Sequence, residues 1–107
     1  MTRQVKERPD LERIIGLLKD DKFLISKHAR IRMFQRNIST DDIRDAIMAG
    51  EMIEEYGADE PCPSALVLGF LESIPYHVVV AECDDHVRIV TVYRPVEDRW
   101  IGYRVRR

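Results

Sequence analysis

The hydrophobic pattern of this chain changes its period once, close to Gly50. Before Gly50, apolar residues recur at the three- and four-residue spacing of amphipathic helices. After it, β-branched and aromatic residues gather in short runs of the kind found in strands. Helices followed by antiparallel strands are typical of an α+β domain in which the helices cover one face of a meander. We therefore expect two to three N-terminal helices packed on a twisted antiparallel sheet of about four strands.

Capping residues indicate where the helices begin and end. Asp10 and Ser26 each stand at the start of a helical segment, and Ser39 begins a sequence with the spacing of a capping box. Gly50 suits the end of the third helix. Residues 22–26 are either a brief strand or an extended lead-in to the second helix. The later strand candidates are residues 52–56, 65–72, 76–83 and 87–93.

Length and composition suit one domain with a single core, because the chain has 107 residues and is 45% hydrophobic. We take residues 1–107 as that domain. The apolar runs are too short to span a bilayer, and the N-terminal residues lack the apolar core of a signal peptide. We therefore expect a cytoplasmic protein that does not enter a membrane. Cys62 and Cys83 have no close pairing motif, and in that reducing setting both would be free thiols.

Positive charge is concentrated in the segment "SKHARIRMFQR", residues 26–36, although the formal net charge of the chain is −2. Helical geometry, at about 100° per residue, places four polar residues on a common side: His28, Arg32, Gln35 and Arg36. Three apolar residues are left for packing: Ala29, Met33 and Phe34. A charged stripe of this kind is most often a solvated face. A functional interpretation needs a second polar group that converges on the same place.

The predicted hairpin of the last two strands offers such a group. A two-residue turn at 84–85 would put His77 opposite Val92, whereas one more residue in the turn would put it opposite Tyr93. In either register His77 and Tyr93 are near neighbours at one end of the hairpin, and Arg94 follows. His77 interrupts an otherwise apolar strand. It is therefore either a functional group or a core histidine that a backbone carbonyl satisfies.

Histidine, tyrosine and arginine together suit the cleavage of RNA without a metal. This reaction needs a base for the 2′-hydroxyl proton, cations for the phosphorane oxygens and an acid for the leaving 5′-oxygen. The catalytic candidates are His28, His77 and Tyr93, the last as an acid or as a stacking surface for a base. The substrate-binding candidates are Lys27, Arg32, Gln35, Arg36 and Arg94. The same residues would equally serve a phosphate-binding face without chemistry.

A zinc site is the main alternative chemistry, and the spacing of its ligands argues against it. The residues able to bind zinc are His28, His77, Cys62 and Cys83, and they include no paired spacing such as C-x-x-C. We therefore predict neither a metal nor another cofactor.

Two charged segments remain. The carboxylates within 51–55 indicate a solvent-facing strand edge or an acidic patch for a partner. In the basic tail, Trp100 and Tyr103 pack on the domain while the arginines reach an acidic partner, or else the tail frays.

Several motifs occur together in an order that resembles a known family. They are a histidine-alanine start with arginines at helical spacing in "SKHARIRMFQR", an "IS-x-x-D-I" second helix, a glycine stop and a closing "TVY-x-P" strand. Over about residues 24–100 the chain resembles the bacterial and archaeal domain of unknown function 4258. Each motif is weak by itself, and the combination is specific.

This resemblance implies a RelE-like fold, a compact arrangement of helices on an antiparallel sheet that often occurs in toxins that cleave messenger RNA. It also implies a partner, because members of the family are often encoded beside small zinc-finger antitoxins of the MqsA type. His28, Arg32 and Arg36 match the family's histidine-arginine motif, and His77 and Tyr93 match its strand histidine and closing tyrosine.

Two functions follow from these expectations. The first is a toxin-like, metal-independent endoribonuclease of a toxin–antitoxin pair, in which a His/Arg helix face binds RNA and general acid/base chemistry cleaves it. The second is a small non-catalytic interaction module that binds a protein or a nucleic acid. Oligomeric state stays open, and an unpaired strand edge is where a homodimer would form.

Overall fold

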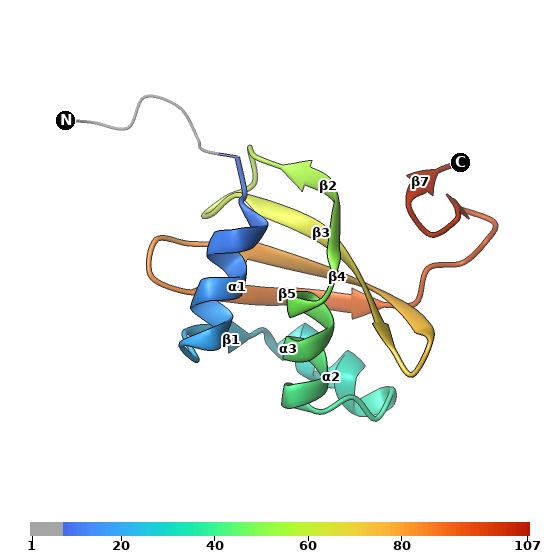
Figure 1. Ribbon diagram of the computed structural model, residues 1–107, viewed down its shortest axis with the longest axis horizontal. Coiled ribbons are helices and arrows are strands. Elements are labelled where there is room, and N and C mark those ends of the chain that lie inside the picture. Colours follow the sequence, from blue (N-terminus) through green and yellow to red (C-terminus); the bar gives the residue numbers. More distant parts are fainter. Residues whose placement is uncertain (1–7) are drawn as a thin grey trace.

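The computed structural model describes residues 8–107, in which the three helices precede β2 and the strands after it, as the change of period predicts (Figure 1). The α+β prediction is confirmed. In chain order the elements are α1 (Leu11–Lys19), β1 (Phe23–Ile25), α2 (Lys27–Gln35), α3 (Thr40–Met48), β2 (Glu51–Tyr56), β3 (Ser64–Leu71), β4 (Ile74–Glu82), β5 (Val87–Tyr93), β6 (Trp100–Ile101) and β7 (Val105–Arg106).

The main sheet has five strands in the order β1-β5-β4-β3-β2, whereas we expected about four. Strands β2 to β5 form the predicted antiparallel meander. β1 pairs parallel with β5, so the expected antiparallel sheet is a mixed one. A strand of three residues is too short to show a period of its own, which explains why its pairing was missed. A second sheet contains only β6 and β7.

The predicted capping residues do begin the three helices. The Asp10 carboxylate and the Ser26 hydroxyl each accept a backbone N–H from the first turn of their helix. Ser39 and Asp42 make both hydrogen bonds of a capping box, at 3.0 and 3.2 Å. These local bonds fix the start of α1, α2 and α3 without help from distant parts of the chain.

Two glycines allow α3 to lie directly against β3. A Cβ on Gly69 would stand 2.6 Å from the carbonyl oxygen of Ala46, and one on Gly50 would stand 2.7 Å from a methyl group of Val67. Both distances are too short for any other residue to fit without displacing the helix. α3 ends just before Gly50, as predicted.

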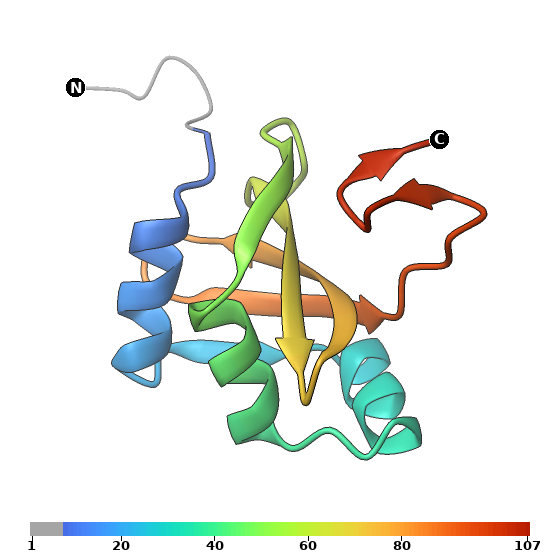
Figure 2. The same cartoon turned by 45° about the vertical axis from the view of Figure 1, so that its right-hand side comes forward.

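Both faces of the sheet are covered. On one face, side chains such as Val67, Val78 and Ile89 pack with the three helices into the main core. On the other, His77 is fully buried, and Trp100 from the C-terminal segment packs against it. Figure 2 shows α1 and α3 on one side of the sheet and the β6–β7 hairpin on the other. The helices lie on one face, as predicted, and the C-terminal tail covers the second.

Candidate functional site

A β-bulge in β5 brings Tyr93 onto the face of the sheet that carries His77. The register between β4 and β5 shifts by one residue at Val90. Ile89 and Val92 therefore both join the helix-side core, although they are three residues apart. Because side chains alternate between faces, Tyr93 lies on the opposite face, directly paired with His77.

The extra residue lies in the strand and not in the turn. The β4–β5 turn has two central residues, Asp84 and Asp85, because Cys83 donates its N–H to the carbonyl of His86 at 2.9 Å. A two-residue turn alone would have paired His77 with Val92. Of the two predicted registers at His77, the second is therefore correct, but the cause is the bulge at Val90 and not a longer turn.

A second bulge, in β2, places Glu54 on the same face of the sheet as His77. The β2–β3 register shifts at Ile53, so that Met52 pairs with Val67 and Glu54 pairs with Leu66. Val67 belongs to the helix-side core, and Leu66 is buried on the other face. Without the extra residue, Glu54 would point towards the helices. Two irregularities in the sheet thus deliver a carboxylate and a phenol to the face of one buried histidine.

His77 uses both ring nitrogens in contacts within the protein. Its Nε2 lies 2.6 Å from the carbonyl oxygen of Tyr103, and its Nδ1 lies 3.2 Å from the hydroxyl of Tyr93. A carbonyl can only accept, so Nε2 carries the proton and Nδ1 accepts from the Tyr93 hydroxyl. Burial lowers the pKa of His77, although the bond to the Tyr103 carbonyl acts in the opposite direction. Burial also raises the pKa of Tyr93, which keeps that hydroxyl available as a donor.

The tail closes over His77 through an aromatic side chain and a cation. The Trp100 ring meets His77 edge-on, with 4.4 Å between centroids, and the Arg106 guanidinium lies 4.7 Å from the centre of the Trp100 ring. Arg106 also pairs with Glu54 at 2.9 Å, and the Tyr56 hydroxyl donates to the same carboxylate. We call these residues the His77 cluster: Glu54, Tyr56, His77, Tyr93, Trp100, Tyr103 and Arg106.

Charges within the His77 cluster are matched. Burial opposes the ionisation of Glu54, but hydrogen bonds from Arg106 and Tyr56 outweigh it and hold the pKa of that carboxyl below its usual value. Burial, together with the bond to Glu54, raises the pKa of Tyr56 to about 12. Within residues 8–107 no buried side-chain nitrogen or oxygen lacks a hydrogen-bond partner, and His77 has no exposed surface. In this conformation His77 cannot take a proton from a substrate.

The predicted polar stripe on α2 has the opposite character. Lys27, His28, Arg32, Gln35 and Arg36 are all exposed. Within residues 8–107, none of these side chains makes a hydrogen bond or an ion pair. By contrast, several arginines on other elements are paired: Arg8 with Glu55, Arg44 with Asp21 and Asp41, and Arg104 with Glu51. We call the exposed side of α2 the basic face.

The packing prediction for α2 is correct for two residues and wrong for the third. Ala29 and Met33 are buried in the main core, whereas the Phe34 side chain is 88% exposed. On a helix, Phe34 lies on the side of Lys27 and Arg30, away from the buried residues. The structure therefore adds an aromatic ring to the basic face.

The structure brings together only part of the predicted site. His77 and Tyr93 meet, whereas His28 and Arg32 lie on a helix that packs against the other face of the sheet. Arg94 is exposed just beyond the end of β5. Ser26 Oγ caps α2 and also donates to the carbonyl of Val90, the bulged residue, at 2.7 Å, so it joins the helix of the basic face to the bulge that positions Tyr93.

Five members of the His77 cluster were not among the predicted site residues: Glu54, Tyr56, Trp100, Tyr103 and Arg106. Of the two alternatives predicted for the tail, packing and fraying, the structure shows the first, with Trp100 against His77 and the tail arginines on acidic residues. These acidic residues belong to the carboxylate run of the same chain, where Arg104 pairs with Glu51 and Arg106 with Glu54. Glu54 and Tyr56 stand two positions apart in β2 and so share a face, but the bulge at Ile53 puts that face out of phase with Met52.

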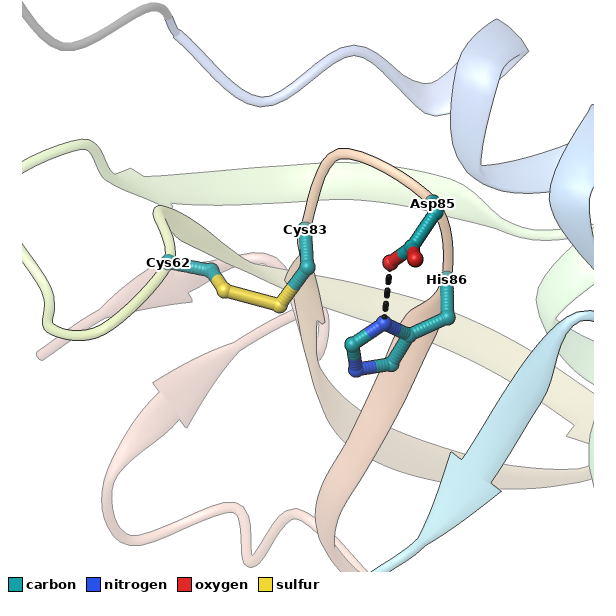
Figure 3. The surroundings of a disulfide bond; sticks show 4 residues. All are labelled: Cys62, Cys83, Asp85 and His86. Atoms are coloured by element: carbon teal, nitrogen blue, oxygen red, sulfur yellow. Dashed lines mark hydrogen bonds and ion pairs between the residues drawn. A yellow bond between two sulfur atoms is a disulfide. The ribbon is translucent and has the colours of Figure 1, made fainter.

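The free-thiol prediction is wrong, because Cys62 and Cys83 form a disulfide with a Cα–Cα distance of 5.2 Å (Figure 3). β3 and β4 pair Ser64 with Ala81, and two residues further out this register brings the cysteines together. Their equal distance from the turn between these strands was the missed signal. The disulfide also removes the thiolates from the zinc alternative. It is more typical of an oxidising compartment than of the reducing cytoplasm that we expected.

A cavity of about 870 Å³ lies beside the disulfide, between α1 and the β4–β5 turn, and Leu17, Asp20 and Glu82 are among its lining residues. None of the predicted site residues lines it. Arg13 bridges to Glu82 there at 2.6 Å. Of the helices in residues 8–107, none has the length and apolar composition needed to cross a membrane.

Comparison with known proteins identifies a family and nothing more specific. The sequence model described as Domain of unknown function (DUF4258) matches residues 25–94. No curated protein and no solved structure matches the chain. The matched span begins at the end of β1, contains α2, His77 and Tyr93, and stops before the tail that covers them. Because this span is more than half of the chain, the protein belongs to the DUF4258 family.

Proposed function

We propose that this protein binds RNA through the basic face of α2. The observation that carries the proposal is the contrast between paired and unpaired cations. Arg13 on α1, Arg44 on α3 and Arg106 on β7 are each paired with carboxylates of the same chain. Within residues 8–107, by contrast, Lys27, Arg32 and Arg36 have no such partner and are gathered on one helix. Unpaired, exposed cations are free to displace counterions from a phosphate backbone.

The local distribution of charge explains how a chain with a net charge of −2 would bind a polyanion. The acidic run at 51–55 lies on β2, where arginines of the tail and Arg8 neutralise it. No acidic residue lies between Asp21 and Asp41, and that interval includes all of α2. A field of one sign over one helix is sufficient for association, because interactions between exposed charges are screened beyond about 10 Å at 0.1 M salt.

The test is a titration of a labelled RNA oligonucleotide against the protein, followed by fluorescence anisotropy at several salt concentrations. The logarithm of the affinity should fall linearly with the logarithm of the salt concentration. The double variant Arg32→Ala/Arg36→Ala should reduce this slope by about two and weaken binding about tenfold or more at low salt.

The matched control is Arg44→Ala/Arg104→Ala, which removes the same charge from two arginines that are already paired. It should leave the slope close to that of the unmodified protein. Equal losses in both double variants would show that net charge, and not the basic face, governs binding. An unmodified protein that does not bind RNA at low salt would refute the proposal.

Cleavage of the bound RNA is the second candidate function, and the pairing of His77 with Tyr93 favours it. In the structure Trp100 and the Tyr103 carbonyl contact the His77 ring and cover it. Cleavage therefore requires the tail to move away from His77. Arg106→Ala removes the contact with Glu54 and the stacking on Trp100, and should speed RNA cleavage in EDTA. The double variant Arg106→Ala/His77→Ala should be inactive. Equal cleavage with and without His77 would rule out this role.

A further inference from the structure

Phe34 is the most exposed large hydrophobic side chain in the described part of the molecule. Its exposed fraction is 88%, and the next highest values are 59%, at Leu24 and Val105. Ala29 and Met33 of the same nine-residue helix are buried in the core, and an aromatic ring could have packed there too. Instead it projects from the side of α2 that faces away from the core.

Two neighbours of Phe34 on the helix surface are cationic, and a third, Ile31, is apolar and 49% exposed. Arg30 lies one turn before Phe34 and Lys27 two turns before it, at the spacing that places side chains on one side of a helix. Both are exposed, and within residues 8–107 neither side chain forms an ion pair or a hydrogen bond. Ile31 lies between this flank and the stripe of His28, Arg32 and Gln35, and the ring and the cations share the exposed side of α2.

The chemistry of this flank fits a nucleotide whose base is not paired. Every base presents a π-face to an aromatic ring, and cations on either side suit the phosphates of the same strand. In double-stranded RNA the bases are already stacked, and the deep, narrow major groove excludes side chains. Phe34 would find no surface to stack on there.

We infer that Phe34 stacks on an unpaired base, with Arg30 and Lys27 on the adjoining phosphates, so that the ligand is single-stranded RNA. The inference rests on the proposed RNA binding by α2 and specifies its ligand class. It adds two residues, Arg30 and Phe34, to those predicted from the sequence.

The experiment compares a single-stranded oligonucleotide with a duplex of the same sequence, for the unmodified protein and for Phe34→Leu. The unmodified protein should bind the single strand more tightly than the duplex. Phe34→Leu should weaken binding of the single strand about tenfold, because a base loses its stacking partner, and should leave binding of the duplex unchanged. Phe34→Tyr keeps the ring and should retain full affinity.

The matched control is Leu24→Ala, which removes an exposed apolar side chain from β1. It should not affect RNA binding. Circular dichroism should show unchanged melting for Phe34→Leu, because the ring is not part of the core. Because the duplex and the single strand both carry phosphate charge, nonspecific attraction to that charge would not make Phe34→Leu affect one and spare the other.

Three results would overturn the inference. Equal affinity of Phe34→Leu and the unmodified protein for the single strand would remove the stacking role and leave RNA binding by α2 intact. Duplex binding as tight as single-strand binding would do the same. The third result is that polyglutamate displaces the RNA and that Phe34→Leu weakens the binding of polyglutamate but not of RNA. The flank would then be a docking surface for acidic proteins. If neither RNA binds at all, the proposed function fails before the inference is reached.

Discussion

The basic face of α2 and the His77 cluster contain the same kinds of side chain, namely histidine, arginine and an aromatic ring, yet they differ in what those side chains contact. In the cluster, Trp100 packs against the His77 ring, and Arg106 lies over Trp100 and pairs with Glu54. His77 is also hydrogen-bonded to the Tyr103 carbonyl. On the basic face, the side chains have no partner within residues 8–107. The comparison shows that residue type indicates what a group can do, and that its contacts decide whether it is free to do it.

Of the substitutions that test this difference between the two regions, we expect Trp100→Ala to lower stability most. Trp100 is 4% exposed and touches both His77 and Arg106, so its removal leaves a void between the tail and the sheet. We expect the free energy of unfolding to fall by about 3 kcal/mol, measured by urea denaturation. RNA affinity should not change, because α2 packs on the other face.

Ile101→Ala is the control for this variant, since Ile101 is the next residue and is 52% exposed. It should change stability by less than about 0.5 kcal/mol. A loss of RNA affinity in Trp100→Ala without unfolding would mean that the two regions act as one site.

A smaller effect is expected at Ser26, whose hydroxyl contacts both the first turn of α2 and the bulge of β5. Ser26→Ala removes the cap of α2 and leaves the Val90 carbonyl without its hydroxyl donor. The free energy of unfolding should fall by about 1–2 kcal/mol. If the bulge couples the cap to Tyr93, then Ser26→Ala and Tyr93→Phe should not be additive in a double-mutant cycle.

Ser39→Ala provides the comparison, because it removes a cap of the same kind from α3. Combined with Tyr93→Phe it should be additive to within about 0.5 kcal/mol. Additivity in both cycles would show that the cap of α2 and the His77 cluster are independent.

The smallest expected effect is a dependence of stability on pH. Burial is the main reason that folding lowers the pKa of His77 below its usual value of about 6.5, so the folded protein disfavours the charged form relative to the unfolded chain. As the pH falls below about 6.5, the unfolded state binds the proton first, and stability must decline until the folded pKa is reached. Urea denaturation between pH 7.5 and 5.5 should show this decline.

His77→Gln should lose the decline over this pH range, and the same substitution at the exposed His28 should keep it. Measurements above pH 5 largely separate the effect from Glu54, whose pKa lies below its usual value and whose contribution is lost at lower pH. A rise in stability on acidification over this range would contradict the neutral, carbonyl-bound state of His77.

What could be predicted from the sequence depended on local signals. The capping bonds of Asp10, Ser26 and Ser39 join residues two or three positions apart, and all three were predicted correctly. The proximity of His77 and Tyr93 could also be predicted from the sequence, because a tight hairpin turn restricts the strand register to a few choices.

The missed features depend on residues that are distant in sequence. Tyr103 reaches His77 across 26 positions, and Arg106 reaches Glu54 across 52. The exposure of Phe34 was missed because a helical period shows which side of α2 is apolar only when the polar and apolar sides are separated. In α2 the apolar residues occur on both sides, so tertiary packing decided which of them would be buried.

The two bulges have a consequence for aligning this chain with its relatives. A gap of one residue at Val90 or Ile53 would exchange the inward and outward positions of everything beyond it in that strand, whereas a gap of two would restore them. The number of residues between Ile89 and Tyr93 therefore indicates whether an aligned tyrosine can reach the strand histidine at all. Two family members with identical residues in these strands but different spacing would have different neighbours around that histidine.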